Sequence, residues 1–148
     1  MSAFDSYDLI LIYNIHPSLL SIINFLLLYD AAYIGDVVFE LYVRSKHVWP
    51  SKRTSDLQNR VVAIVRAEHQ SHLLTQLKND FHLNDKENQV LMRGRNSVTR
   101  SKNRRNPAAY QDSTSFEALV GYLYISDQSR CSELLNWLDS IVDDTTIP

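Results

Sequence analysis

Hydrophobic residues recur at three- and four-residue steps along most of the chain, which is the spacing of one face of an α-helix. In the first half, this pattern predicts a helix over residues 17–28 that opens at Pro17. That helix continues or kinks into a second one over residues 31–47. A single long helix is predicted to follow over about residues 55–78.

Shorter helices are predicted in the second half. The first has Asn84 as its N-cap, Glu87 at the third position to complete a capping box, and Gly94 at its end. The other two cover "STSFEALVGYLYIS" (residues 113–126), with Asp112 or Ser113 as N-cap, and "SRCSELLNWLDSIV" (residues 129–142). No pair of strands with hairpin turn chemistry and no internal repeat is found. The sequence therefore predicts an all-α helical bundle in a single domain.

The helix predicted over residues 31–47 carries two acids in an otherwise apolar segment, "AAYIGDVVFELYVR". Asp36 and Glu40 are four residues apart, so they share one face of the helix. Like charges on one face repel each other, and they lose hydration if that face is buried. The pair therefore needs a neutralising partner.

Two of the three glycines lie inside strongly helical segments, where glycine costs about 1 kcal/mol relative to alanine. Gly35 directly precedes Asp36, and Gly121 lies one helical turn after Glu117. Such glycines usually permit the close approach of another backbone. We therefore predict that the two helices cross at their glycines and bring Asp36 and Glu117 together. Converging carboxylates need a proton or a cation between them, and Mg²⁺ or Mn²⁺ suits such oxygen ligands.

A structural interpretation of these acids stays open at this point. Acids in apolar helices also lie at the polar edge of a helix, or pair with a basic residue. Arg44 lies one turn beyond Glu40. Glu40 therefore either forms an ion pair with Arg44 or assists Asp36 and Glu117 in holding the metal.

Residues 93–105, "RGRNSVTRSKNRR", hold six of the fifteen Lys and Arg residues. No acid lies between Glu87 and Asp112, so the local field is positive although the formal net charge of the chain is -2. Guanidinium groups and asparagine amides suit phosphate oxygens, and the lack of aromatic residues argues against stacking on single-stranded bases. The segment is therefore either a solvated run of charge or a contact for the backbone of double-stranded RNA. The candidate RNA-binding residues are Arg93, Arg95, Asn96, Lys102, Asn103, Arg104 and Arg105.

The composition fits one globular domain, with 148 residues, 45% of them hydrophobic and 22% charged. The one cysteine, Cys131, excludes an intrachain disulfide and is expected to be buried as a small hydrophobic residue. The longest uncharged apolar run, residues 16–29, is too short to span a bilayer. The start of the chain lacks the basic residues of a signal peptide, so we expect no contact with a membrane.

Three segments of the chain resemble the Mini-ribonuclease III family, the short branch of the ribonuclease III endonucleases that lacks a double-stranded-RNA-binding domain. They are "AYIGDVVFELYVR" (residues 32–44), "RGRN" (93–96) and "STSFEALVGYLYIS" (113–126). Their order and spacing agree with the family, and the resemblance extends from about residue 28 to 138. "NPAAYQDST" (106–114) is most similar to cyanobacterial and plastid members, which implies a bacterial cytoplasm or a plastid stroma.

The resemblance implies an all-α ribonuclease III catalytic domain over residues 26–144, preceded by an N-terminal extension at residues 1–25, and active as a homodimer. It implies Mg²⁺-dependent hydrolysis of double-stranded RNA, notably in maturation of the large-subunit (23S-type) ribosomal RNA precursor. Asp36 and Glu117 match the catalytic, metal-binding aspartate and glutamate of the family.

The chain also departs from the longer ribonuclease III enzymes. Those enzymes carry further acids seven residues before the aspartate and three before the glutamate, where this chain has Tyr29 and Thr114. The short branch resembles this chain in lacking both acids, so the resemblance still implies activity, with fewer protein ligands. The segment after "RGRN" lacks the glycine that many members have there.

The leading hypothesis is therefore a Mg²⁺-dependent endoribonuclease. One alternative is a catalytically weak or inactive RNA-binding or ribosome-assembly module of the same fold. The other is a helical protein–protein adaptor. Binding through phosphate contacts weakens steeply as salt rises, whereas that of an adaptor does not.

Overall fold

Helices make up nearly all of the chain that the computed structural model describes, which is residues 28–98 and 105–142. They are α3 (Leu28–His47), α4 (Thr54–Val65), α5 (Ala67–Asp80), α6 (Asp85–Asn96), α7 (Pro107–Ser126) and α8 (Gln128–Val142). No strand occurs within these ranges, so the all-α prediction is confirmed. Residues 17–27 of the helix expected over residues 17–28, and the extension expected at residues 1–25, lie outside the described residues.

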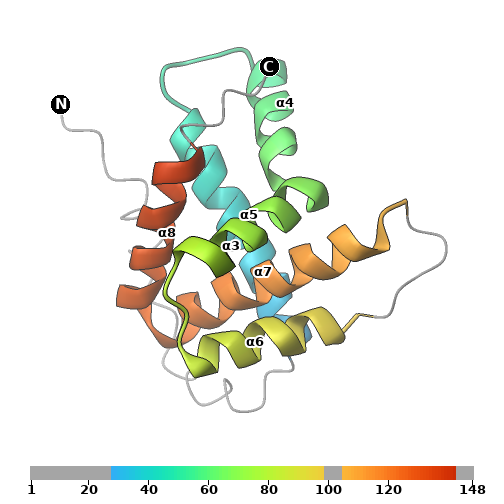
Figure 1. The fold of residues 1–148 in the computed structure, drawn as a ribbon. Helices are drawn as coiled ribbons and strands as arrows, with labels where there is room; N and C mark the ends of the chain where they lie inside the picture. Colours follow the sequence, from blue (N-terminus) through green and yellow to red (C-terminus); the bar gives the residue numbers. More distant parts are fainter. Residues whose placement is uncertain (1–27, 99–104, 143–148) are drawn as a thin grey trace.

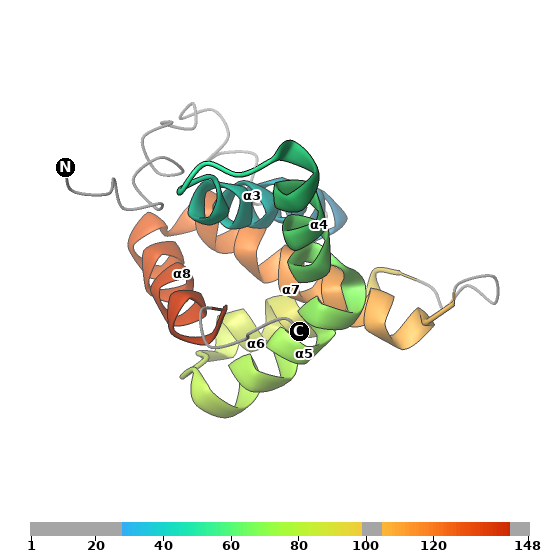
Figure 2. The ribbon, with the colours of Figure 1, turned by 90° about the horizontal axis from the view of Figure 1, so that it is seen from above.

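α7 lies at the centre of the bundle. Figure 1 shows α6 running alongside α7, and Figure 2 shows α3 on one side of α7 with α5 and α6 on the other. Its buried residues include Phe116, Leu119 and Leu123, and they are distributed around the whole helix, as expected for a helix covered on several sides. The Phe116 ring meets the edge of Phe39 of α3, with ring centres 5.1 Å apart. α7 therefore forms the core against which the other helices are placed.

α6 begins as the sequence predicts but ends later. The Asn84 side chain accepts a hydrogen bond from the Glu87 backbone N–H at 2.9 Å, and the Glu87 carboxylate accepts one from the Asn84 N–H at 2.9 Å. The prediction that Gly94 ends this helix is wrong, because α6 continues to Asn96. Gly94 is buried against α7, where an added Cβ would lie 2.8 Å from the Cβ of Ala118. It is a close-approach glycine rather than a cap.

The single long helix expected over about residues 55–78 is in fact two helices, α4 and α5. Arg66 separates them in an extended conformation, with φ -62° and ψ 151°. Buried hydrophobic residues occur on both sides of the break, among them Ile64 in α4 and Leu73 in α5. The periodicity continues across Arg66, so the pattern gave no signal of the break.

α7 begins at Pro107, and the prediction that Asp112 or Ser113 caps it is wrong. The Asn106 side chain accepts a hydrogen bond from the Ala109 backbone N–H at 3.1 Å, and proline follows as the first helical residue. Asparagine as N-cap and proline at the next position form a common start of a helix. The additional turns place Tyr110 on α7, beside the candidate site described below.

The last described helix, α8, agrees with the prediction from the sequence. α8 covers the predicted segment, and Cys131 within it is fully buried, which raises the pKa of its thiol to about 12. A thiol held neutral in this way is an inert part of the core. Across the described ranges, we find no helix with both the length and the apolar character that crossing a bilayer requires.

Candidate metal centre

α3 and α7 cross at Gly35 and Gly121, as the sequence predicts. An added Cβ on Gly35 would lie 1.8 Å from the Glu117 carbonyl oxygen, and one on Gly121 would lie 1.9 Å from the Ala31 carbonyl oxygen. These are backbone atoms in both cases, so the two helices touch directly and have no space for a side chain. The crossing brings Asp36 from α3 and Glu117 from α7 to the same pocket.

The pocket at this crossing has a volume of about 210 Å³. Besides the two carboxylates, most of its lining carries hydroxyl groups. The remaining lining residues are Ala32, Tyr33, Tyr110, Ser113 and Thr114. The Thr114 hydroxyl donates a hydrogen bond to the Tyr110 carbonyl oxygen at 3.0 Å. Thr114, the position at which the resemblance implies an acid in the longer enzymes, therefore carries a neutral hydroxyl that is bonded within its own helix.

No basic side chain among the described residues neutralises the two carboxylates. Within the described ranges, neither Asp36 nor Glu117 forms an ion pair. Burial, together with the nearby charge of Asp36, raises the pKa of Glu117 to about 7. Asp36 is exposed at the mouth of the pocket, and its partial desolvation there, together with the charge of Glu40, raises its pKa as well. Without a cation, Glu117 therefore holds a proton below about pH 7, and a bound cation would take the place of that proton.

These donors fit a hydrated hard cation. Mg²⁺ commonly binds through one or two carboxylates and keeps several of its waters. In the described part of the chain, no group of three or more His, Cys, Asp and Glu side chains converges on one point. Asp36 and Glu117 could thus supply two protein ligands to Mg²⁺ or Mn²⁺, and the hydroxyl-lined pocket leaves room for water.

Glu40 takes one of the two roles that the sequence left open. Its carboxylate accepts hydrogen bonds from Arg44 Nε at 2.9 Å and from Arg44 Nη2 at 2.6 Å. The pair lies one helical turn apart at the surface of α3. Metal ligation by Glu40 stays a prediction.

The predicted RNA-binding residues are placed differently from one another. Arg93 and Asn96 are exposed on α6, and Arg105 is exposed just before α7. Arg95 instead forms an ion pair with Asp112 of α7, whose other oxygen accepts a hydrogen bond from the Ser71 hydroxyl at 2.8 Å. Arg95 therefore links α6 to α7 at the base of the basic segment.

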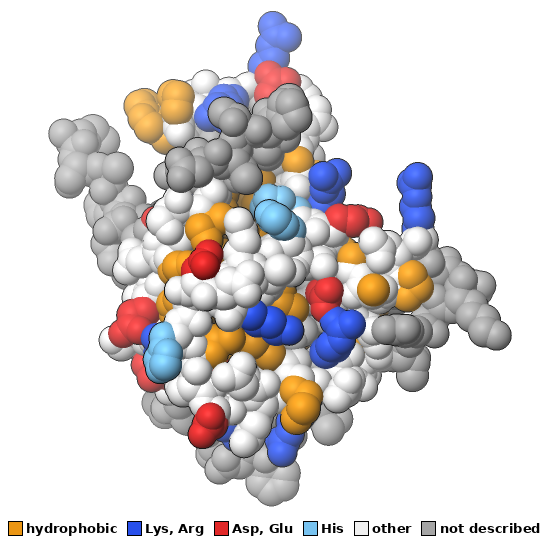
Figure 3. All heavy atoms as spheres, viewed as in Figure 1, with side chains coloured by type: hydrophobic (Ala, Val, Ile, Leu, Met, Phe, Trp, Pro, Cys, Tyr) orange, Lys and Arg blue, Asp and Glu red, His pale blue; other side chains and the backbone are white. Residues whose placement is uncertain are grey.

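The remaining candidates, Lys102, Asn103 and Arg104, lie outside the described residues. On the face drawn in Figure 3, the described Lys and Arg side chains are spread among acids rather than gathered in one patch. RNA binding by the basic segment stays a prediction.

Sequence reasoning missed Gln70. This side chain is 1% exposed, and its amide nitrogen donates a hydrogen bond to Glu117 Oε1 at 3.0 Å. Gln70 lies on the buried face of α5, together with Leu73, Leu74 and Leu77. A polar residue on an apolar helix face is the same signal that pointed to Asp36, so it was available in the sequence.

Comparisons with known proteins agree with this fold. Residues 30–128 match the ribonuclease III domain family. The Mini-ribonuclease 3 of Synechocystis sp. (strain ATCC 27184) is 48% identical over 104 residues, which cover 70% of this chain and 71% of that protein. The Mini-ribonuclease 3 of Gloeobacter violaceus is 42% identical over 108 residues, covering 73% and 78%. Both relatives are cyanobacterial, as the resemblance of residues 106–114 predicts.

Solved structures also show a likeness of fold. The crystal structure of protein FN1578 from Fusobacterium nucleatum aligns with a TM-score of 0.66. The alignment covers 76% of this chain and 91% of that chain, at 23% sequence identity. At this identity, the likeness supports the all-α architecture alone.

Proposed function

Because this chain belongs to the ribonuclease III family, in its Mini-ribonuclease 3 branch, and is thus an endoribonuclease, we propose that it hydrolyses double-stranded regions of RNA with Mg²⁺ held by Asp36 and Glu117. The supporting observation is that α3 and α7 bring these two carboxylates to one pocket without a described basic partner. When bound there, Mg²⁺ or Mn²⁺ supplies a Lewis acid that polarises the scissile phosphate and lowers the pKa of the attacking water. Asp36 on α3 and Glu117 on α7 would hold the cation in a fixed position, because the backbones of these two helices are in contact.

The basic segment positions the RNA in this proposal. Arg93, Asn96 and Arg105 hold phosphate oxygens from the surface of the molecule, joined by Lys102, Asn103 and Arg104. Arg95 contributes by tying α6 to Asp112 of α7. The substrate we propose is the large-subunit ribosomal RNA precursor, as the family resemblance implies. The compartment is then the one that contains this precursor, a bacterial cytoplasm or a plastid stroma.

The experiment that tests the proposal uses the full chain with long double-stranded RNA and with a fragment of a ribosomal precursor. We expect cleavage of both in Mg²⁺ or Mn²⁺ and none in a chelator. At limiting Mg²⁺, the rate should rise from pH 6 to pH 8. The reason is that the pKa of Glu117 is raised to about 7, and the cation binds only its deprotonated form.

The alternative function, a weak or inactive RNA-binding module, is favoured by the small number of converging acids in the described ranges. That module would shift the mobility of the RNA in a salt-dependent manner and would not cut it at any metal concentration. If the protein neither cleaves nor binds RNA, both of these functions are contradicted, and the adaptor hypothesis is left.

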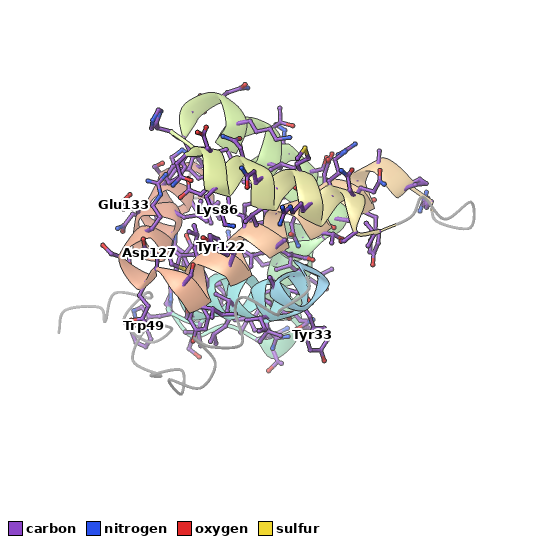
Figure 4. The ribbon with its side chains drawn as sticks, turned by 90° about the horizontal axis from the view of Figure 1, so that it is seen from below. Tyr33, Trp49, Lys86, Tyr122, Asp127 and Glu133 are labelled. Atoms are coloured by element: carbon purple, nitrogen blue, oxygen red, sulfur yellow. The ribbon has the colours of Figure 1, made fainter. Side chains whose placement is uncertain are left out.

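We further propose that the protein acts as a homodimer joined along α3. Tyr33, Val37 and Leu41 form a stripe at four-residue spacing, and they are 74%, 60% and 44% exposed. Figure 4 shows Tyr33 on the side of the molecule away from α6, the same side on which Trp49 is exposed. An apolar stripe of this kind commonly marks a contact with another protein. A symmetric pair of α3 helices would place two Asp36–Glu117 pockets in one particle, one for each RNA strand.

Replacing Val37 by glutamate is expected to convert this dimer into a folded monomer, because a charge is placed in the apolar contact while no core residue changes. The matched control is Met92→Glu, since Met92 is similarly exposed at 58% but lies on α6. Light scattering at micromolar concentration reads the mass, and circular dichroism checks the fold. A wild-type monomer, or a Val37→Glu dimer, would contradict the proposed interface.

A further inference from the structure

A buried glutamine holds the carboxylate of Glu117. Gln70 lies on α5, and its amide nitrogen donates hydrogen bonds to Glu117 Oε1 at 3.0 Å and to the Val65 carbonyl oxygen at 2.8 Å. Both hydrogens of the amide are thereby used. The side chain is therefore fixed at two points, one at the end of α4 and one at the metal centre.

The break between α4 and α5 is built around this side chain. In a continuous helix, the Val65 carbonyl would accept from the N–H of His69. Here the backbone N–H of His69 donates to the Arg66 carbonyl oxygen at 3.1 Å. The Val65 carbonyl oxygen instead accepts from the side-chain amide of Gln70. Gln70 thus compensates for the break that Arg66 introduces, and it does so while bonded to Glu117.

The oxygen of the Gln70 side-chain amide differs from the nitrogen in its hydrogen bonding. This atom, Oε1, is buried and has no hydrogen-bond partner among the described residues. A buried acceptor without a partner is unfavourable, and an apolar side chain of similar volume would avoid it. What the amide provides at this position is therefore the two hydrogen bonds of its nitrogen.

We infer that Gln70 is a positioning residue that fixes the rotamer of Glu117 and thereby leaves Glu117 Oε2 available as a ligand for a cation that Asp36 and Glu117 would hold. In the described structure, Oε2 accepts no hydrogen bond, whereas Oε1 is held by Gln70. The inference rests on the proposed metal-dependent function. Groups that orient a metal ligand typically contribute 10–100-fold to metal affinity.

Mn²⁺ binding to the full chain, measured by electron paramagnetic resonance of the free ion, tests the inference. Gln70→Met keeps the length and approximate volume of the side chain and removes both donors. We expect about 10–100-fold weaker Mn²⁺ binding. Binding of double-stranded RNA in a chelator should be unchanged, and saturating Mn²⁺ should restore cleavage.

Gln76→Met is the matched control. Gln76 lies on the same helix, and its Oε1 is likewise buried without a partner in the described structure. None of the hydrogen bonds between described residues joins it to Glu117. Its variant should bind Mn²⁺ with wild-type affinity.

Wild-type Mn²⁺ affinity in a folded Gln70→Met protein would overturn the inference, as would equal weakening in Gln76→Met. If Gln70→Met does not fold, Gln70→Leu replaces it. If neither folds, Gln70 serves only the fold, and the inference is wrong. A wild-type chain that neither binds Mn²⁺ nor cleaves RNA would contradict the proposed function itself, which separates the two failures.

Discussion

Replacing Asp36 by asparagine is expected to abolish cleavage of double-stranded RNA while leaving the fold and RNA binding unchanged. Asp36 is exposed on α3 and accepts no hydrogen bond from the described residues, so the isosteric amide removes no contact of the core. What it removes is one of two carboxylates in the pocket. Charge stabilisation by a bound metal is worth several kcal/mol, so we expect a loss of about a thousandfold or more in the cleavage rate.

Glu40→Gln is the matched control for this variant. It makes the same change of acid to amide one turn along the same helix, and breaks only the surface ion pair with Arg44. An exposed pair of this kind contributes little to stability, so the variant should remain folded and cleave RNA. Loss of cleavage in Glu40→Gln would instead make Glu40 a metal ligand. Substantial cleavage by folded Asp36→Asn, with both proteins compared by single-turnover kinetics in Mg²⁺, would contradict the metal centre.

The convergence of Asp36 and Glu117 on one pocket could be predicted from the sequence, because both residues depart from the local pattern of their helices. Asp36 and Glu117 are charged residues in apolar segments, and each lies near a glycine that a helix does not favour. Both departures have one physical cause. Two helices cross closely, and each carries an acid at the crossing that has no ion-pair partner among the described residues. The structure shows that crossing, with the backbones of α3 and α7 in contact at Gly35 and Gly121.

Other features could not be predicted in this way, because their causes lie between helices. The bond from Gln70 to Val65 compensates for the break at Arg66, and the hydrophobic periodicity continues across the break unchanged. Gly94 has the sequence position of a helix end, yet its contact with Ala118 of α7 determines its role. Such contacts are set by tertiary packing, which overrides local signals.

The ion pair of Arg95 shows that predictions of function from sequence are limited in the same way. A run of basic residues predicts a surface that binds phosphate, and the exposed Arg93 and Arg105 are consistent with that. Composition alone did not show that Arg95 is already paired with Asp112, or that Ser71 of α5 holds the same carboxylate. One member of the run therefore supports the helix on which Glu117 is carried, rather than facing solvent.

Replacing Gly35 or Gly121 by alanine is expected to give the largest loss of stability among single substitutions at the site. The added Cβ would lie 1.8 Å from the Glu117 carbonyl oxygen in the first case, and 1.9 Å from that of Ala31 in the second. Both contacts are with backbone, so no side chain can move aside and the helices must separate. Overpacking of this kind typically costs about 1–3 kcal/mol, and we expect the upper end or more, which lowers Tm by roughly 10 °C.

Gly94→Ala is the control, because Gly94 is also a buried helical glycine facing α7. Its added Cβ would lie 2.8 Å from the Ala118 Cβ and 3.2 Å from the Ser115 Cα, which is a looser contact than the 1.8 and 1.9 Å to carbonyl oxygens at the other two glycines. The gain of about 1 kcal/mol in helix propensity on changing glycine to alanine is common to all three variants. We therefore expect Gly94→Ala to unfold at a distinctly higher temperature than Gly35→Ala or Gly121→Ala. The two crossing variants should also lose cleavage while still folded, because separation of α3 from α7 moves Asp36 away from Glu117. Thermal unfolding with parallel cleavage assays reads both effects, and equal stability of all three variants would mean that the helices do not meet at their backbones.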